Sequence, residues 1–251
     1  MQKRALTRLK YLSLVVIILL AGYAITIVFP IADQSAHGQN GPRVANAFYV
    51  QPLGDVELDK LAVVKEVLDE NFAREVVILP PEKLRRPHFV SARNQYDASR
   101  IMEWARGQIP QQAFRYIVVV DEDIFADGLN FIFGQAEING RMCVISLARF
   151  AEPQEHIALW ESALFKRRTA NLLLHELGHT FNLMHCGNDD CVMKFANSLV
   201  ELDNQRDHYC ADCLAKLGRA GIISVFTETG EAIIYLHKEI PQGRNDGNAI
   251  R

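Results

Sequence analysis

Three histidines and one glutamate have the residue types and the spacing of a zinc site. Residues 175–185 read HELGHTFNLMH. Four residues of an α-helix turn through about 400°, so His175 and His179 leave the same face one turn apart, as two ligands of one zinc ion must. Glu176 lies beside them and is placed to act as a general base toward a water on that ion. Scattered polar residues of an ordinary helix are the alternative, but a chance match to all these positions is rare.

A third histidine, His185, can join the same ion only if the helix ends before it and the chain turns back. On a continuing helix, its Cα would lie about 9 Å beyond His179 and about 120° away from the metal-facing side. The turn requires a left-handed backbone near Asn182, and Asn is the non-glycine residue that most readily adopts positive φ. We therefore predict that His175, His179 and His185 hold a catalytic zinc with its fourth position open.

Four of the five cysteines follow these histidines, at Cys186, Cys191, Cys210 and Cys213. Two close pairs separated by a loop predict a tetrahedral thiolate site for a second, structural zinc. Such a site would brace the backbone that carries His185. Two disulfides are the alternative if the domain lies in an oxidising compartment.

Two other sulfur-containing residues are ambiguous by themselves. Met193 is by default a core residue, but its position eight residues after His185 also suits a hydrophobic floor beneath the imidazoles. Cys143 alternates with apolar residues within 141–146 and is expected to be a buried thiol.

The elements that must position these residues alternate between strand and helix. Apolar periodicity predicts strands at 46–51, 75–79 and 114–120, helices at 57–72 and 96–106, a long helix at 161–184 that carries the histidines, and a short helix at 214–219. The pair Asn139-Gly140 between 129–137 and 141–146 predicts an antiparallel hairpin that closes a partly parallel sheet. Its edge is either an ordinary covered strand or a surface that aligns an extended peptide.

The N-terminal residues differ from the rest in charge and hydropathy. Residues 1–10 carry four basic side chains and no acid, and residues 11–29 carry no charge. This pattern predicts a single-pass transmembrane helix that places the catalytic domain on the extracytoplasmic side. A cleaved signal peptide, which would make the protein secreted, and a buried core helix are the alternatives.

Composition limits the remaining possibilities. The 251 residues are 49% apolar with a net charge of −3, enough for one core and without the basic excess of a nucleic-acid-binding protein. We expect four parts: a basic stub and anchor (1–30), a polar linker (31–44), a catalytic domain (45–221), and a C-terminal hairpin with a disordered tail (222–251). The sequence gives no oligomeric state.

With these residues identified, the chain resembles the archaemetzincins, a branch of the metzincin metallopeptidases. Their signature is HExxHxxGxxHC, then x4-C-x-M, a spacer and CxxC; it is matched from His175 to Cys213, and the resemblance covers about residues 46–218. The Gln95-Tyr96 pair and the segment DEDIFADGLNFIFGQA are also similar to that family. Two features depart from the pattern: Asn182 replaces Gly, and the spacer before the last cysteine pair is one residue shorter.

The resemblance implies a fold and a set of roles. The fold would be α+β and metzincin-like, a twisted mixed sheet with helices, an active-site helix and a small Cys-rich, zinc-bound C-terminal part. His175, His179 and His185 would bind the catalytic zinc, Glu176 would act first as base and then as acid, and Met193 would form the Met-turn. The four cysteines Cys186, Cys191, Cys210 and Cys213 would bind the structural zinc, giving two Zn2+ ions per chain.

These observations predict a membrane-tethered zinc metallopeptidase that hydrolyses peptide or protein substrates, with endopeptidase and aminopeptidase action both open. One alternative is a zinc-containing peptide-binding domain with little or no hydrolytic activity. The intact Glu176 argues against it, because a domain that only binds peptides does not need that base. A zinc hydrolase acting on another kind of bond is the third possibility.

Overall fold

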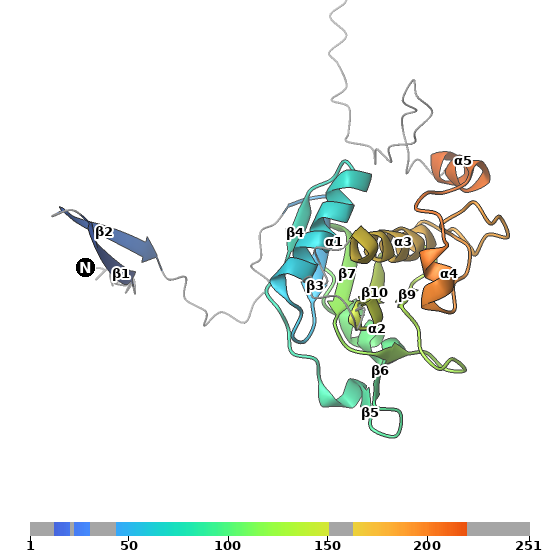
Figure 1. Ribbon diagram of the computed structural model, residues 1–251, viewed down its shortest axis with the longest axis horizontal. Helices are drawn as coiled ribbons and strands as arrows, with labels where there is room; N and C mark the ends of the chain where they lie inside the picture. Colours follow the sequence, from blue (N-terminus) through green and yellow to red (C-terminus); the bar gives the residue numbers. More distant parts are fainter. Residues whose placement is uncertain (1–12, 21–22, 31–43, 151–162, 220–251) are drawn as a thin grey trace, which may run out of the picture. The chain divides into compact units, whose positions relative to one another are not determined.

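The computed structural model describes residues 13–20, 23–30, 44–150 and 163–219 (Figure 1). The chain divides into two compact units, Met1–Asn40 and Gly41–Arg251, and each is described by itself. The described part of the first unit is a two-stranded antiparallel sheet of β1 (Ser13–Leu20) and β2 (Tyr23–Pro30).

The prediction of an N-terminal transmembrane helix is wrong. The described residues of the uncharged run pair as strands, with Ser13 opposite Pro30 and Leu20 opposite Tyr23. Across the described ranges, no helix is both long enough and apolar enough to span a bilayer. Hydropathy alone does not separate helix from strand, and a run this rich in Val and Ile favours paired strands. The single-pass localisation derived from that helix is therefore wrong as well, and the predicted membrane partner has no support.

The second unit is built on a five-stranded sheet in the order β4-β3-β7-β10-β9. Its strands are β3 (Ala47–Pro52), β4 (Val76–Ile78), β7 (Ala113–Val120), β9 (Gly134–Ala136) and β10 (Met142–Ser146). The first four strands of that order are parallel, and β9 pairs antiparallel with β10 at the edge. The predicted mixed sheet, with a central strand near 114–120, is confirmed.

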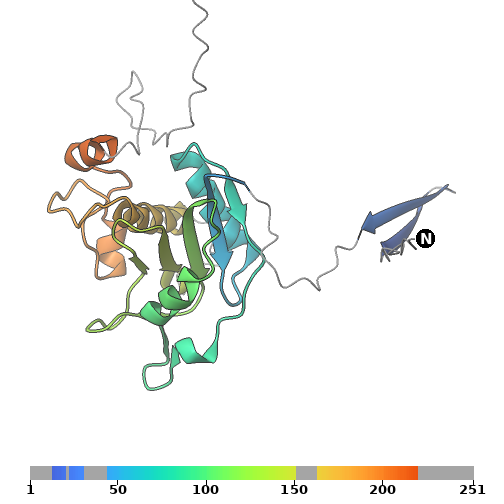
Figure 2. The ribbon, with the colours of Figure 1, turned by 180° about the vertical axis from the view of Figure 1, so that it is seen from behind.

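Helices cover both faces of this sheet (Figures 1 and 2). The helices are α1 (Leu58–Asn71), α2 (Ala98–Arg106) and α3 (Ala163–Thr180). Side chains of a strand alternate between faces, so Ile117 and Val119 pack with α1 and α3, while Tyr116 and Val118 pack with α2. The long buried helix α3 is therefore fixed on the sheet along most of its length.

Smaller elements complete the unit. A second sheet joins β5 (Phe89–Val90), β6 (Gln95–Asp97) and β8 (Ile124–Phe125), and the helices α4 (Leu199–Asp203) and α5 (Ala211–Arg219) follow α3. The predicted strand 129–137 is shorter than expected, because only Gly134–Ala136 pairs with β10. The predicted hairpin and tail within 222–251, and the predicted linker except Val44, lie outside the described residues.

Candidate metal centre and active-site cleft

The helix that carries the first two histidines ends at Thr180, and the chain then turns back. The Asn182 N–H donates to the His179 carbonyl at 2.9 Å, and the Leu183 N–H donates to the Gly178 carbonyl at 2.9 Å. This is the pair of hydrogen bonds of a Schellman motif, with Asn182 in the left-handed conformation at φ 69°. The predicted left-handed turn is confirmed, and it brings His185 back toward the end of α3.

The turn places the three imidazoles side by side. One ring nitrogen each from His175, His179 and His185 lies within 4.8 Å of the other two. His175 Nδ1 lies 2.8 Å from the Val192 carbonyl oxygen, and His179 Nδ1 lies 2.8 Å from the Leu183 carbonyl oxygen. A carbonyl oxygen only accepts, so each Nδ1 carries the proton and each Nε2 is left with a free lone pair.

This arrangement fits a zinc ion. His175 Nε2 and His179 Nε2 lie 3.2 Å apart, close to the separation of about 3.3 Å between two nitrogens of a tetrahedral zinc site. Two lone pairs held at that distance repel unless a cation lies between them. Burial lowers the pKa of all three histidines, that of His175 to about 4, so at neutral pH they are uncharged, as metal ligands must be.

Glu176 lies on α3 next to His175 and packs against the edge strand β9. Its side chain is buried, and burial raises the pKa of the carboxyl to about 8. A Cβ at Gly134 would lie 2.7 Å from Glu176 Oε1 and 2.8 Å from its Cγ, closer than real Cβ contacts. A residue without a side chain at position 134 is therefore required for β9 to pass beside this carboxylate.

A second glycine allows a close contact beneath the histidines. Met193 is fully buried, and a Cβ at Gly178 would collide with its Sδ and would lie 3.1 Å from Tyr209 Cε1. Tyr209 also donates from its hydroxyl to the Leu174 carbonyl of α3 at 2.6 Å. Met193 therefore packs directly on α3 between the two helical histidines.

The four cysteines that follow the histidines form a compact sulfur cluster. All five cysteines of the chain are free thiols, and the Sγ atoms of Cys186, Cys191, Cys210 and Cys213 lie within 4.8 Å of one another. The Cys186–Cys210 and Cys191–Cys213 sulfurs are 3.8 and 3.7 Å apart. A disulfide requires about 2.05 Å, whereas a tetrahedral site with Zn–S bonds of about 2.3 Å has sulfurs about 3.8 Å apart. The cluster fits zinc better than disulfides.

The fifth cysteine is separate from this cluster. Cys143 is fully buried on β10 within the core between the sheet and α3, and burial raises the pKa of its thiol. The prediction that it is a core residue is confirmed.

The sulfur cluster and the histidines share a short stretch of backbone. The Cys186 N–H donates to the Met193 carbonyl at 2.8 Å, which ties the residue after His185 to the segment beneath α3. Val192 lies between Cys191 and Met193, and its carbonyl is the acceptor for His175 Nδ1. An ion bound by the four cysteines would therefore also restrict the orientation of the His175 imidazole, through the Val192 carbonyl.

A cleft of about 340 Å3 opens beside the three histidines. Its lining is largely aromatic and aliphatic, with Phe131, Phe133 and Leu172 among the lining residues. Phe195 lies with its ring centroid 5.0 Å from that of His185 and is half exposed. The edge strand β9 lines the same cleft, and among the described residues no strand pairs with its outer edge, which lies beside the candidate metal centre.

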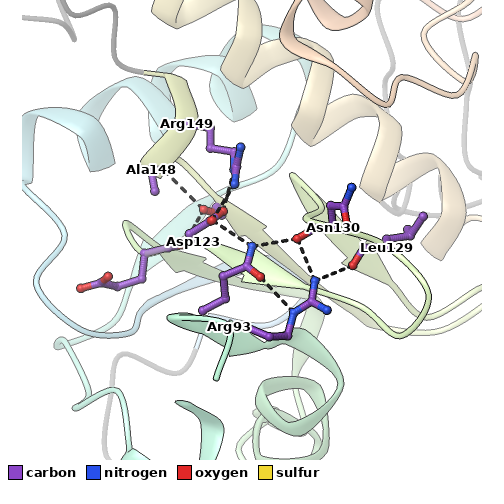
Figure 3. A network of polar contacts seen from close by, with 9 residues as sticks. Arg93, Asp123, Leu129, Asn130, Ala148 and Arg149 are labelled. Carbon is purple, nitrogen blue, oxygen red and sulfur yellow. Dashed lines mark hydrogen bonds and ion pairs between the residues drawn. The ribbon is translucent and has the colours of Figure 1, made fainter. Parts of the chain in front are cut away.

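A network of hydrogen bonds and ion pairs fixes the irregular segment that precedes β9 (Figure 3). Arg93 donates to the carbonyls of Leu129 and Asn130 at 2.7 and 2.9 Å. Gln95 donates from Nε2 to the Asn130 carbonyl and to Asp123 Oδ2, both at 2.9 Å. These bonds give the carbonyl groups of Leu129 and Asn130 the partners that a strand ladder would otherwise supply.

The same network continues through a charged pair. Arg149 binds both carboxylate oxygens of Asp123 at 2.7 Å, and its guanidinium lies 3.8 Å from the Phe131 ring centroid. Burial by itself would raise the pKa of the Asp123 carboxyl. Hydrogen bonds from Arg149 and Gln95 nevertheless hold that pKa below its usual value. Phe131, a residue of the cleft wall, is therefore packed against a guanidinium that is itself fixed in orientation.

Sequence reasoning missed several residues of this site. Gly134 and Gln135 were expected only as parts of an edge. Arg93 and Gln205 were not expected at all, although Gln205 lines the cleft and donates from Nε2 to the Val192 and Lys194 carbonyls. The FGQA segment did contain a signal, because a glycine inside a strand pattern marks a close approach of the backbone. Nothing in the sequence indicates which carbonyl groups Arg93 and Gln205 reach.

Known proteins resemble this chain over up to about 70% of its length. The model of peptidase family M54 matches residues 88–219. The archaemetzincin of Methanocaldococcus jannaschii is 35% identical over 173 residues, 69% of this chain and 93% of the relative. The archaemetzincin of Methanopyrus kandleri is 38% identical over 137 residues, 55% of this chain and 74% of the relative.

Solved structures agree with the predicted fold. The crystal structure of the archaemetzincin of Archaeoglobus fulgidus, complexed with malonate, is 31% identical with a TM-score of 0.59 and covers 68% of this chain and 99% of that chain. The crystal structure of the Methanopyrus kandleri archaemetzincin is 32% identical with a TM-score of 0.59 and covers 71% of this chain and 97% of that chain. The predicted α+β, metzincin-like fold is confirmed.

Proposed function

The chain belongs to peptidase family M54, the archaemetzincins, and from this membership we propose that its histidine cluster hydrolyses peptide bonds with Glu176 as general base. Family membership makes the chain a zinc metallopeptidase, whose substrates are peptides or proteins. The residue roles, the number of ions and the way a substrate binds are parts of the proposal.

His175, His179 and His185 hold the catalytic ion in this proposal. The observation that carries it is the pair of imidazoles whose Nε2 atoms face each other at 3.2 Å while both Nδ1 atoms are committed to backbone carbonyls. Zinc bound there supplies an activated water and a positive charge that polarises the scissile carbonyl. Met193 closes the site from below as an apolar floor, since it is fully buried against Gly178.

Glu176 moves the proton. It follows His175 on α3 and lines the cleft, and a cation bound at the histidines would favour its ionised form, so the carboxylate can accept a proton from the attacking water. The same oxygen then carries that proton to the leaving amine, and the carboxylate is regenerated. Burial keeps bulk water away from the Glu176 carboxylate. Because Gly134 has no side chain, the backbone of β9 leaves space for that carboxylate.

The four cysteines hold a second, structural ion in this proposal. Four thiolates leave no open coordination position, so this site takes no part in the reaction. Its contribution is to fix the backbone from Cys191 to Met193, which includes the carbonyl that orients His175. We therefore expect two zinc ions per chain, one at each cluster.

The substrate lies along the edge strand β9 in this proposal. A strand edge that lines the cleft offers N–H and C=O groups to an extended peptide, and Gly134 and Gln135 lie within reach of it. The apolar lining supplied by residues such as Phe131 and Phe133 accommodates apolar side chains of that peptide. The second candidate function is peptide binding without hydrolysis. The observation that favours it is the same edge of β9 beside the cleft.

The test is the substitution Glu176→Gln, which preserves size and removes the base. We expect kcat to fall by about 10³-fold, because general acid–base catalysis of this kind contributes 10²–10⁴-fold. The zinc content, measured by metal analysis of the purified chain, should stay at the parental value.

Peptide digestion with and without a chelator provides the control for both candidates. Hydrolysis that stops with chelator and returns with added zinc supports the peptidase. Parental turnover by Glu176→Gln would refute the role of Glu176. A parent chain that binds zinc and peptides but never cleaves them would favour the binding domain.

A further inference from the structure

We infer that Gln205 is a positioning residue for the catalytic metal site, acting on His175 through the carbonyl of Val192. The inference rests on the proposed function, because it assigns a task within the same site. Gln205 lies in the loop after α4, thirty residues beyond His175 in the sequence, and only the folded chain brings the two together.

The amide of Gln205 holds the turn that carries Met193. Its Nε2 lies 2.5 Å from the Val192 carbonyl oxygen and 2.5 Å from the Lys194 carbonyl oxygen. Two carbonyl acceptors around one atom identify that atom as the NH2 group, which has one hydrogen for each. The two acceptors are the residues on either side of Met193, so one side chain clamps both ends of this turn.

One of these acceptors is shared with a metal ligand. The Val192 carbonyl oxygen accepts from His175 Nδ1 at 2.8 Å as well as from Gln205 Nε2 at 2.5 Å. A carbonyl oxygen has two lone pairs, and both are used here. Fixing this oxygen fixes the direction of the His175 Nδ1–H bond, and therefore the direction in which the opposite Nε2 points.

Gln205 is itself held by the helix that carries the ligand. Asn171 lies on α3 one turn before His175 and is fully buried. Its Nδ2 donates to the Leu202 carbonyl at 3.1 Å and to the Gln205 carbonyl at 3.3 Å. The contacts therefore form a closed circuit from α3 through Asn171, Gln205 and Val192 back to His175.

Burial makes this circuit costly to break. Gln205 is 9% exposed, and loss of its NH2 group would leave the Lys194 carbonyl without this donor and the Val192 carbonyl with His175 alone. The expected consequence is a less strictly oriented imidazole and a weaker metal site. Substitutions of groups that orient metal ligands typically cost 10–100-fold in metal affinity or activity.

Two substitutions test the inference by zinc affinity and not by activity alone. Gln205→Glu keeps the shape but faces two carbonyl oxygens with a carboxylate, and Gln205→Met removes the donor without adding charge. We expect the zinc affinity of the histidine site, measured by competition with a chromophoric chelator, to fall by about tenfold in both variants. The cysteine site should keep its ion, as judged by unchanged protection of the four thiols from a thiol reagent.

Asn204→Asp is the matched control. Asn204 precedes Gln205, is exposed, and donates from Nδ2 to the Val200 carbonyl at 2.8 Å, so the same amide-to-acid change is made outside the circuit. It should leave the zinc affinity of the histidine site at the parental value.

Each outcome has one meaning. Parental affinity in Gln205→Met overturns the inference. Parallel loss of both ions together with a lower melting temperature in Gln205→Met also overturns it, because the residue would then support the fold in general. Failure of the parent chain to bind zinc at its histidines would refute the proposed function instead.

Discussion

The two sides of the cleft are built by different means. The metal-side wall (residues 175–213) combines the buried helix α3, a Schellman turn and two clusters of ligand atoms. The strand-side wall (residues 126–136) is mostly irregular, and the side chains of Arg93 and Gln95 donate hydrogen bonds to its carbonyl groups. One wall is fixed by the packing of a buried helix, to which the proposed metal ions would add coordination, and the other by hydrogen bonds from Arg93 and Gln95.

This difference suggests a division of tasks. Metal ligands must converge to within a few tenths of an ångström, which a buried helix and a rigid sulfur cluster can provide. A wall that receives peptides of varied sequence needs less exact placement, and an exposed arginine can supply it. We therefore expect loss of a metal ligand or of its support in the metal-side wall to alter zinc binding, and loss of the hydrogen bonds from Arg93 to the strand-side wall to alter KM.

Among the tests of this comparison, the largest expected effect comes from breaking the metal-side wall at Cys191. Cys191→Ser should release the structural ion and loosen the adjacent backbone at Val192, so zinc content falls from two ions to one or none. Activity should fall by about 100-fold or more, since the support of a metal ligand is lost together with the local fold. Metal analysis and turnover measurements test this.

Cys143→Ala is the control for that change. Cys143 is buried but belongs to neither cluster, so its removal should preserve both ions. Two retained zinc ions in Cys191→Ser would contradict the two-site arrangement.

A smaller effect is expected where the two walls meet, at Gly134. In Gly134→Ala the new methyl group displaces the Glu176 carboxylate, and kcat should fall by about 10- to 100-fold because a misplacement of about 1 Å can cost that much. Zinc content should not change. Gly218→Ala, on α5 outside both walls and where a Cβ meets nothing within 4 Å, should turn over at the parental rate. Equal rates in both variants would show that Gly134 does not position Glu176.

The smallest effect is expected on the strand-side wall. Arg93→Ala removes the donors to Leu129 and Asn130, and KM should rise by about 3- to 10-fold as a loss of one or two hydrogen bonds predicts. Zinc affinity and kcat should change little. Arg86→Ala removes a similar charge from an exposed position and is the control. A loss of zinc affinity in Arg93→Ala would remove the distinction between the two walls.

Most of the sheet was predictable, and the reasons are local. The apolar run at 114–120 and the hairpin at Asn139-Gly140 predicted β7 and the β9–β10 pair, because burial and turn chemistry act over a few residues. The strand before Asn139 was predicted too long, since Leu129 and Asn130 bond to Arg93, and Ile132 bonds to Ile124 of β8 and not to β10. The N-terminal helix was predicted wrongly, because hydropathy does not reveal a strand partner.

The sequence alone determined the ligand types and the turn. The fixed spacing of His175 and His179 follows from helix geometry, and Asn182 at φ 69° supplies the left-handed residue that brings His185 back. Only the tertiary structure decided which backbone oxygens orient those ligands, through Val192, Leu183 and the Gln205 clamp. The physical reason is that ligand spacing is a property of one helix, whereas a hydrogen bond to a distant carbonyl exists only after the chain has packed.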